Sequence, residues 1–250
     1  MKKVKLLFVL TLIFTINIYG QEGDYIKPID RSVQPKQGKT PTIDLKEPTI
    51  FTLKNGLNVI VVENKKLPTF SLRISIDNPP SNEGDRSGLS QLSSALFGEG
   101  SKNVSKDVFN EEVDYLGATI SMGMGFAYAN GLSKHKERIF ELLSDAALNP
   151  SFTQEELDKE KDKLITGLKS SENSPAAIAQ RVTGILTYST DHPYGEFSTE
   201  ESISKVTIKD IEGNYKQMFN PNNAYMVVSG DVEVKEIKDL VSKYFKNWKS

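Results

Sequence analysis

The spacing of apolar residues divides the chain into short strands and helices of ordinary length. Two β-rich runs flank Asn55-Gly56, a dipeptide typical of a tight hairpin turn, and Thr69–Asp77 alternates as a third strand. Later strands are predicted at residues 118–124, 126–133 and 224–230. Helical periodicity predicts helices at residues 88–101, 105–116, 134–148, 153–170, 175–186, 208–219 and 234–245. This order predicts sequential antiparallel pairing of strands rather than strict alternation of strand and helix.

The helix predicted at residues 88–101 combines an apolar stripe with an unreactive face. Three leucines recur at helical spacing and are expected to face a core: Leu89, Leu92 and Leu96. Gln91, Ser94 and Ala95 are three and four residues apart, so they share a neighbouring side of the helix. None of these three side chains ionises or binds a metal tightly. That face therefore carries no obvious chemistry.

Two later helices have recognisable starts. Ser105 is expected to cap the helix at 105–116. The buried stripe of that helix is expected to consist of three apolar residues: Val108, Val113 and Leu116. Thr153 begins the helix at 153–170, and acidic residues follow it where the helix dipole favours negative charge.

The first 20 residues have the pattern of a secretory signal peptide. Lysines at positions 2, 3 and 5 precede an apolar run from Leu6 to Ile18, and Gly20 supplies a small residue for cleavage. This run is shorter than the roughly 20 residues that cross a bilayer, so no membrane anchor is expected. We therefore expect cleavage near Gly20, export to the periplasm or cell envelope, and no membrane association after cleavage.

Three segments are expected along the chain. Residues 1–20 form the signal peptide, and residues 21–47 form a flexible polar arm, because they contain several prolines and lack apolar periodicity. Residues 48–250 form a single folded unit.

Composition narrows the function. The 250 residues are 38% hydrophobic, which is enough for one sizeable core or two modest ones. The formal net charge is −2, so no broad positive field attracts nucleic acid, and nucleic-acid binding is not expected. The absence of cysteine excludes a disulfide framework and an acylated cysteine after the signal.

No other motif predicts catalysis. His135 lies among charged residues and His192 in a turn, and neither has neighbours at metal-ligand spacing. The sequence has no Gly-x-Ser-x-Gly motif that would support a nucleophilic serine. The lone G-x-G at residues 123–125 is typical of a strand bend or a close backbone approach. The acidic cluster at residues 111–114 is on a helix, where its side chains diverge, so a catalytic carboxylate pair is not expected.

Four segments of the chain match, in order, the pattern of one enzyme family. They are FTLKNGLNVIVVEN, DYLGATISMGMGFAYANGLSKH, ALNPSFTQEELDKEKDKL with TDHPYGE, and FNPNNAYMVVSGDV. With these segments the chain resembles the pitrilysin/insulinase-type zinc peptidases, whose relatives include mitochondrial processing peptidase. The resemblance implies an α+β fold, a two-layer α/β unit with a mainly antiparallel sheet packed against helices. It also implies that residues 48–250 are one insulinase-like unit, the N-terminal part of a longer protein.

Catalytic members of that family carry His-x-x-Glu-His on the first helix of the unit. The two histidines bind Zn²⁺, and the glutamate activates the metal-bound water as a general base. Here those positions hold Gln91, Ser94 and Ala95. The third ligand, a glutamate on a later helix, aligns with Gly167, whereas Glu160 matches an acid that supports the ligands from outside. The resemblance therefore implies a chain that has neither the zinc ligands nor the general base.

This pattern implies a catalytically inactive, exported subunit or domain that forms a peptide-binding chamber with a zinc-bearing insulinase-like partner. Such chains often occur as pairs in which one unit carries the zinc site and the other lacks it. The expected ligand is a peptide substrate, and no cofactor is expected in this chain because the partner would hold the zinc. The alternative is an active zinc peptidase whose metal site lies in another domain or chain.

The resemblance also points to a peptide-binding strand. In catalytic relatives the strand after the second helix lies at a sheet edge and pairs with the substrate backbone. Residues 118–124 occupy that position, which gives five candidates: Ile120, Ser121, Met122, Gly123 and Met124. The small side chains would permit close approach, and the methionines would offer adaptable apolar contact. Proline at Ser121 is expected to weaken peptide capture. The alternative is a strand buried inside its own sheet.

Overall fold

The computed structural model describes residues 47–98 and 100–249, together with residues 32, 34, 38–40 and 42. The chain separates into two units, Met1–Asp44 and Leu45–Ser250, and nearly all described residues belong to the second. The predicted signal peptide lies outside the described residues, as does most of the predicted polar arm. In the described part of the chain, no helix has the length and apolar character needed to span a membrane.

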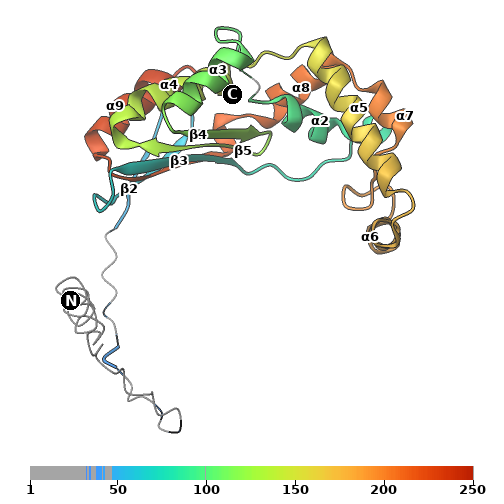
Figure 1. Ribbon diagram of the computed structural model, residues 1–250, viewed down its shortest axis with the longest axis horizontal. Helices are drawn as coiled ribbons and strands as arrows, with labels where there is room; N and C mark the ends of the chain where they lie inside the picture. The colour runs from blue at the N-terminus through green and yellow to red at the C-terminus, as the bar shows by residue number, and fades with distance from the viewer. Residues whose placement is uncertain are drawn as a thin grey trace, which may run out of the picture. The chain divides into compact units, whose positions relative to one another are not determined.

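A six-stranded sheet forms the centre of the second unit (Figure 1). Its strands are β1 Thr49–Thr52, β2 Asn58–Glu63, β3 Thr69–Ile76, β4 Thr119–Gly123, β5 Phe126–Leu132 and β6 Ala224–Gly230. They lie in the order β1-β2-β6-β3-β5-β4, and every neighbouring pair except β2 and β6 is antiparallel. The structure confirms the predicted α+β fold with a mainly antiparallel sheet packed against helices.

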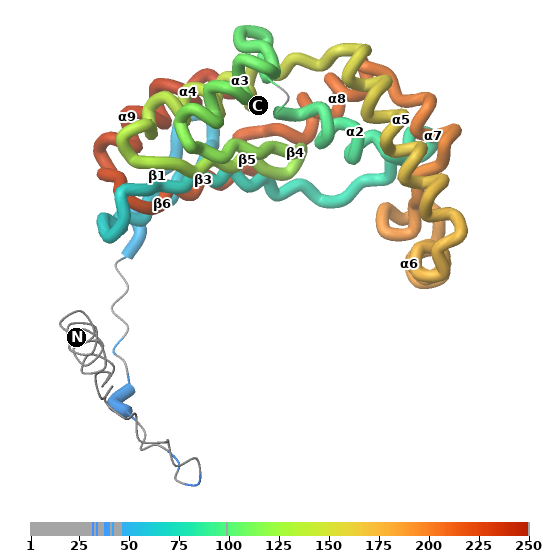
Figure 2. Tube along the Cα trace, viewed as in Figure 1, coloured from blue at the N-terminus to red at the C-terminus, as the bar shows by residue number. Residues whose placement is uncertain are grey.

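The helices form two groups. Their bounds are α2 Leu89–Leu96, α3 Lys106–Tyr115, α4 Lys136–Leu148, α5 Gln154–Ser171, α6 Pro175–Tyr188, α7 Glu200–Lys205, α8 Ile208–Met218 and α9 Val234–Phe245. Helices α3, α4 and α9 cover one face of the sheet, whereas α2, α5, α7 and α8 gather beside it, with α6 at the far end of this second group (Figures 1 and 2). The helix predicted at 88–101 ends at Leu96, because Gly98 and Gly100 follow with positive φ angles of 93° and 92°.

Helix α7 was not predicted from the sequence. It begins with a capping box in which the side chains of Thr199 and Ser202 bond each other's backbone N–H groups, at 3.1 and 2.9 Å. A serine in place of the usual Glu or Gln makes this start harder to read from sequence.

Apolar side chains divide into two cores. In the larger core, one face of the sheet packs against the covering helices, with Leu72 and Ile74 of β3 and Phe140 of α4 fully buried. The smaller core joins α2 to α5, α7 and α8 through six buried residues: Leu92, Leu96, Leu157, Ile203, Val206 and Ile211. Full burial of such a side chain stabilises by about 1.5–3 kcal/mol. The smaller core therefore fixes the position of α2 against α5.

Helix α3 differs from its prediction in two details. Val108 is 54% exposed and Phe109 is buried instead, so the predicted stripe was wrong at Val108. Phe109, Val113 and Leu116 are four and three residues apart, which puts them on one side of the helix, about 100° of rotation away from Val108. Ser105 occupies the N-cap position, but its side chain makes no hydrogen bond to the first turn.

One member of the acidic cluster at residues 111–114 has a structural partner on α4. Arg138 donates from Nε and Nη2 to the two carboxylate oxygens of Glu112, at 2.5 and 2.6 Å. These hydrogen bonds lower the pKa of the Glu112 carboxyl group. Glu112 therefore ties α3 to α4.

Glu112→Gln is expected to lower the free energy of unfolding by about 1 kcal/mol near neutral pH, the scale of one hydrogen bond in a partly exposed ion pair. Because the folded-state pKa of Glu112 lies below its unfolded value, the pair stabilises the fold above the unfolded pKa. That stabilisation is lost as the pH falls through the folded-state pKa. Urea unfolding at about pH 7 and about pH 3 should therefore show a deficit that shrinks in acid. A loss of unfolding free energy that stays constant with pH would contradict this role of Glu112. The matched control is Glu111→Gln, because Glu111 is exposed on the same helix.

Candidate functional site

Helix α2 presents the unreactive face that the sequence predicts. Gly88 precedes it with a φ of 107°, a conformation that favours glycine. Leu92 and Leu96 are buried, whereas Gln91 and Ala95 are exposed. The chemistry available on this side of α2 is limited to the Gln91 amide and the Ser94 hydroxyl.

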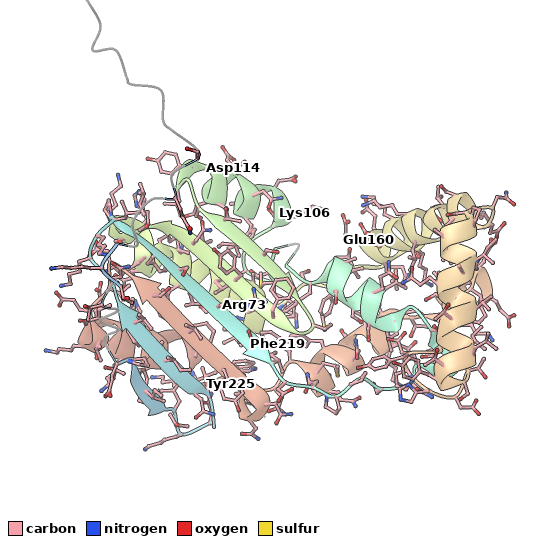
Figure 3. The ribbon with its side chains drawn as sticks, turned by 90° about the horizontal axis from the view of Figure 1, so that it is seen from below. Arg73, Lys106, Asp114, Glu160, Phe219 and Tyr225 are labelled. Atoms are coloured by element: carbon pink, nitrogen blue, oxygen red, sulfur yellow. The ribbon has the colours of Figure 1, made fainter. Side chains whose placement is uncertain are left out.

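A cavity of about 440 Å³ lies between α2 and α5. Its lining comes from both helices: Gln91, Leu92, Ala95, Glu160, Lys163, Leu164, Gly167 and Leu168. Three positions that the resemblance aligned with metal ligands, 91, 95 and 167, therefore meet at one cavity. Glu160 also lines it, and Figure 3 shows Glu160 on α5 beside α2.

Several lining residues were missed in the sequence analysis. Lys163, Leu164 and Leu168 lie three, four and eight residues after Glu160, so they share its side of α5. That helical spacing can be recognised in the sequence and shows that these residues share one side of α5. It indicates a cavity only when α2 is known to lie opposite that side. Ser94 is not among the lining residues.

The donor atoms at this cavity do not fit a zinc ion. A catalytic zinc site takes three protein ligands of the Cys, His, Asp or Glu type and keeps one position open. Ala95 and Gly167 carry no donor, Gln91 offers only an amide, and the Glu160 carboxylate pairs with Lys163. Across the described residues, no group of three or more His, Cys, Asp or Glu side chains could hold a metal ion. No catalytic step through a metal follows from these residues.

The two histidines lie in local structure away from this cavity. His135 occupies the N-cap position of α4. His192 stacks on Tyr188 with ring centroids 5.1 Å apart, and its Nδ1 accepts a hydrogen bond from the backbone N–H of Tyr194 at 3.1 Å. His192 thus shapes the turn after α6.

Strand β4 forms one edge of the described sheet and pairs only with β5. It is not buried inside the sheet, which was the alternative. In an antiparallel ladder, consecutive residues direct their main-chain groups to opposite sides. The N–H of Ser133 donates to Pro68 and the N–H of Ile76 donates to Gly125, both at 2.9 Å. Odd-numbered residues of β5 therefore face β3, and even-numbered residues face β4.

The same alternation fixes which groups of β4 face outward. Ser121 lies opposite Tyr128, so its N–H and C=O bond to β5, whereas Ile120 and Met122 direct theirs to the free edge. The outward N–H of Met124 donates to Ser94 Oγ at 3.2 Å, which links the end of β4 to α2. Proline at Ser121 would remove a hydrogen bond between β4 and β5 and would leave the free edge of β4 unchanged. Ser121 was therefore the wrong position for testing peptide binding at that edge.

The side chains of β4 correct a second expectation. Met122 and Met124 are only 9% and 4% exposed. Their side chains fill the core, so the predicted apolar contact from these methionines was wrong. A Cβ on Gly123 would lie 3.0 Å from the Phe126 ring of the same hairpin, so glycine leaves room for that ring. The close approach of another chain to this segment stays a prediction. What β4 can offer a peptide is its main chain.

Known proteins resemble this chain in sequence and in structure. The chain is 23% identical over 207 residues to a Bacillus subtilis protein named uncharacterized zinc protease YmxG, covering 80% of this chain and 50% of that protein. It is 21% identical over 182 residues to a Helicobacter pylori protein named non-peptidase homolog YmxG, covering 70% of this chain and 42% of that protein. The chain thus spans half or less of the length of these curated relatives.

Solved structures share the fold. A structure described as a peptidase M16 inactive domain from Pseudomonas fluorescens matches with a TM-score of 0.71 and 20% identity, covering 80% of this chain and 50% of that one. The periplasmic protease PqqL from Escherichia coli matches with a TM-score of 0.65 and 16% identity, covering 84% of this chain and 25% of that one.

Family models match two parts of the chain. The model described as insulinase, peptidase family M16, matches residues 59–190. The model described as the peptidase M16 inactive domain matches residues 205–250. The first match spans more than half of the 250 residues, and the chain therefore belongs to the insulinase family of peptidases, family M16.

Proposed function

We propose that this chain is the non-catalytic unit of an exported insulinase-type peptidase. It forms one wall of a peptide-binding chamber, and a zinc-bearing insulinase-like partner, either a subunit or a domain, supplies the metal. The observation that carries this proposal is the cavity between α2 and α5. The positions aligned with the zinc ligands meet there, but they are occupied by Gln91, Ala95 and Gly167.

The names of relatives support a non-catalytic role. One relative is named a non-peptidase homolog, and one matching structure is described as an inactive domain of this peptidase family. In this chain, the absence of donors on Ala95 and Gly167 leaves too few ligands to activate a water molecule.

Two surfaces suit a peptide chamber. The outward main-chain groups of Ile120 and Met122 can pair with an extended peptide by strand addition. The sheet face opposite α4 and α9 carries no helix in the described part, as Figure 1 shows. Tyr225 is 48% exposed on that face, and Figure 3 shows it on the sheet together with Arg73.

A second candidate is an active zinc peptidase whose metal site lies in another domain of the same polypeptide. It is favoured by the Bacillus relative, which is named a zinc protease and is twice as long as its match to this chain. The two candidates differ in whether His-x-x-Glu-His belongs to the same polypeptide or to a separate one.

Export is supported by the signal-peptide pattern of residues 1–20. The matching PqqL structure is described as periplasmic. Cleavage near Gly20 would leave residues 21–47 as an arm before the folded unit, in the periplasm or cell envelope.

Affinity capture of the chain from its own cells, followed by zinc analysis and a peptide-cleavage assay, tests the proposed pairing. We expect a co-purifying polypeptide with His-x-x-Glu-His, about one zinc ion per pair, and hydrolysis that a chelator abolishes. Finding that motif within the captured chain's own polypeptide would select the second candidate. A pure chain without partner, zinc or peptide affinity would contradict both.

A further inference from the structure

We propose that the cavity between α2 and α5 is a socket that selects one large apolar side chain of an extended peptide, an inference that rests on the peptide-binding role above. The position of a lost metal site would thereby have become a specificity pocket. Its occupant is an aliphatic or methionine side chain.

The lining of the socket is mainly apolar and carries no net charge. Ala95 and Gly167 are too small to fill the space between the helices, and three leucines supply the apolar surface: Leu92, Leu164 and Leu168. The charged groups at the cavity, Glu160 and Lys163, pair with each other. An uncharged apolar side chain fits this lining, whereas an unpaired charge would lose its hydration without gaining a partner.

The socket is large enough for one peptide side chain and some neighbouring atoms of the peptide. At about 440 Å³ it lies in the usual range of ligand sites, roughly 300–1,000 Å³. A second cavity of about 310 Å³ shares Gln91 and Leu168 with it. The two cavities are therefore neighbours, and the second has room for peptide residues that flank the socket.

The socket lies close to the free edge of β4. Ser94 accepts the N–H of Met124, and on α2 it stands next to Ala95 and three residues from Gln91. Side chains three or four residues apart on a helix have Cβ atoms about 5–6 Å apart. An extended peptide paired with Ile120 and Met122 would thus reach the socket just past the end of β4. Because successive side chains of a strand point to opposite faces, one of them can enter.

A host–guest peptide series provides the test. Each fluorescent decapeptide has a polar background of Thr, Ser, Lys and Glu and one central guest residue, Gly, Ala, Leu or Met. Because the guest is the only large apolar group, the peptide can shift its register to place it in the socket. With the full chain we expect the Leu and Met peptides to bind at least about tenfold tighter than the Gly peptide, from the apolar area that the guest buries.

Gly167→Leu places a leucine side chain in the socket from its own wall, where it competes with the guest side chain for the apolar surface. A Cβ at Gly167 meets no atom within 4 Å, and leucine is the better helix former, so the variant should fold. We expect it to bind all guests within about twofold of the Gly peptide. The matched control is Gly213→Leu, at another exposed helical glycine with open space around it, which should keep the tenfold preference. Ala95→Leu places a leucine side chain in the socket from α2 and should repeat the loss of guest preference.

The outcomes separate the socket from the proposed function. If the native chain binds all guests equally and Ile120→Pro abolishes binding, strand pairing stands and the socket is overturned. If Gly167→Leu keeps the guest preference, the socket is also overturned. If the preference for Leu and Met guests survives in Ile120→Pro but disappears in Gly167→Leu, the socket is supported and strand pairing on β4 is excluded. If no peptide binds to the native chain, both the socket and strand pairing on β4 are excluded.

Discussion

A variant carrying Gln91→His, Ser94→Glu, Ala95→His and Gly167→Glu is expected to bind zinc weakly, whereas the chain itself is expected to bind none in stoichiometric amount. The cavity already brings positions 91, 95 and 167 together, so the substitutions restore three ligands on two helices fixed by the smaller core. Affinity should remain about 10- to 100-fold below that of a native site, because the aligned supporting acid, Glu160, pairs with Lys163 instead of orienting a ligand.

Equilibrium dialysis against zinc, followed by metal analysis, measures this difference. The matched control replaces Gly167→Glu with Gly213→Glu, which adds the same carboxylate to a helix outside the cavity and should bind at least about tenfold more weakly. A native chain that retained about one zinc ion, lost on changing Gln91, would overturn the account of the cavity.

Ile120→Pro is expected to weaken the binding of extended peptides at least about tenfold while the fold persists. The N–H of Ile120 points to the free edge, so proline removes a donor that a paired peptide would use, and its ring obstructs close approach. Proline is tolerated on an edge strand where the missing N–H faces solvent. Fluorescence anisotropy with the Leu-guest peptide gives the affinity, and circular dichroism checks the fold.

Two variants separate main-chain from side-chain effects at this edge. Ile120→Ala shortens a half-buried side chain but keeps the N–H, so peptide affinity should stay close to that of the native chain. Ser121→Pro removes a donor to β5 and should lower the melting temperature. Native affinity in a folded Ile120→Pro protein would exclude the free edge of β4 from the binding surface.

The sequence by itself determined most of the elements and the chemical character of the site. Strand alternation and helical periodicity are set by burial of one side of each element, so the α+β order was readable without tertiary information. The substitutions at Gln91, Ala95 and Gly167 are also a property of sequence, because side chains without donor atoms cannot bind zinc in any fold. The sequence predicted less well which residues of a helix are buried. Val108 and Phe109 are neighbours on one helix and both are apolar, and only packing against the sheet decides which of them is buried.

Only the tertiary structure decided strand order, the free edge and the cavity. β6 lies between β2 and β3 and runs parallel to β2, a placement that pairs residues 148 to 167 positions apart. The register of β5 against β3 then determines that Ile120, rather than Ser121, turns its N–H outward. The cavity needs α2 and α5 to be fixed by a core shared with α7 and α8. Periodicity depends on neighbours within a few residues, whereas register and cavities depend on contacts between distant segments, which no local pattern contains.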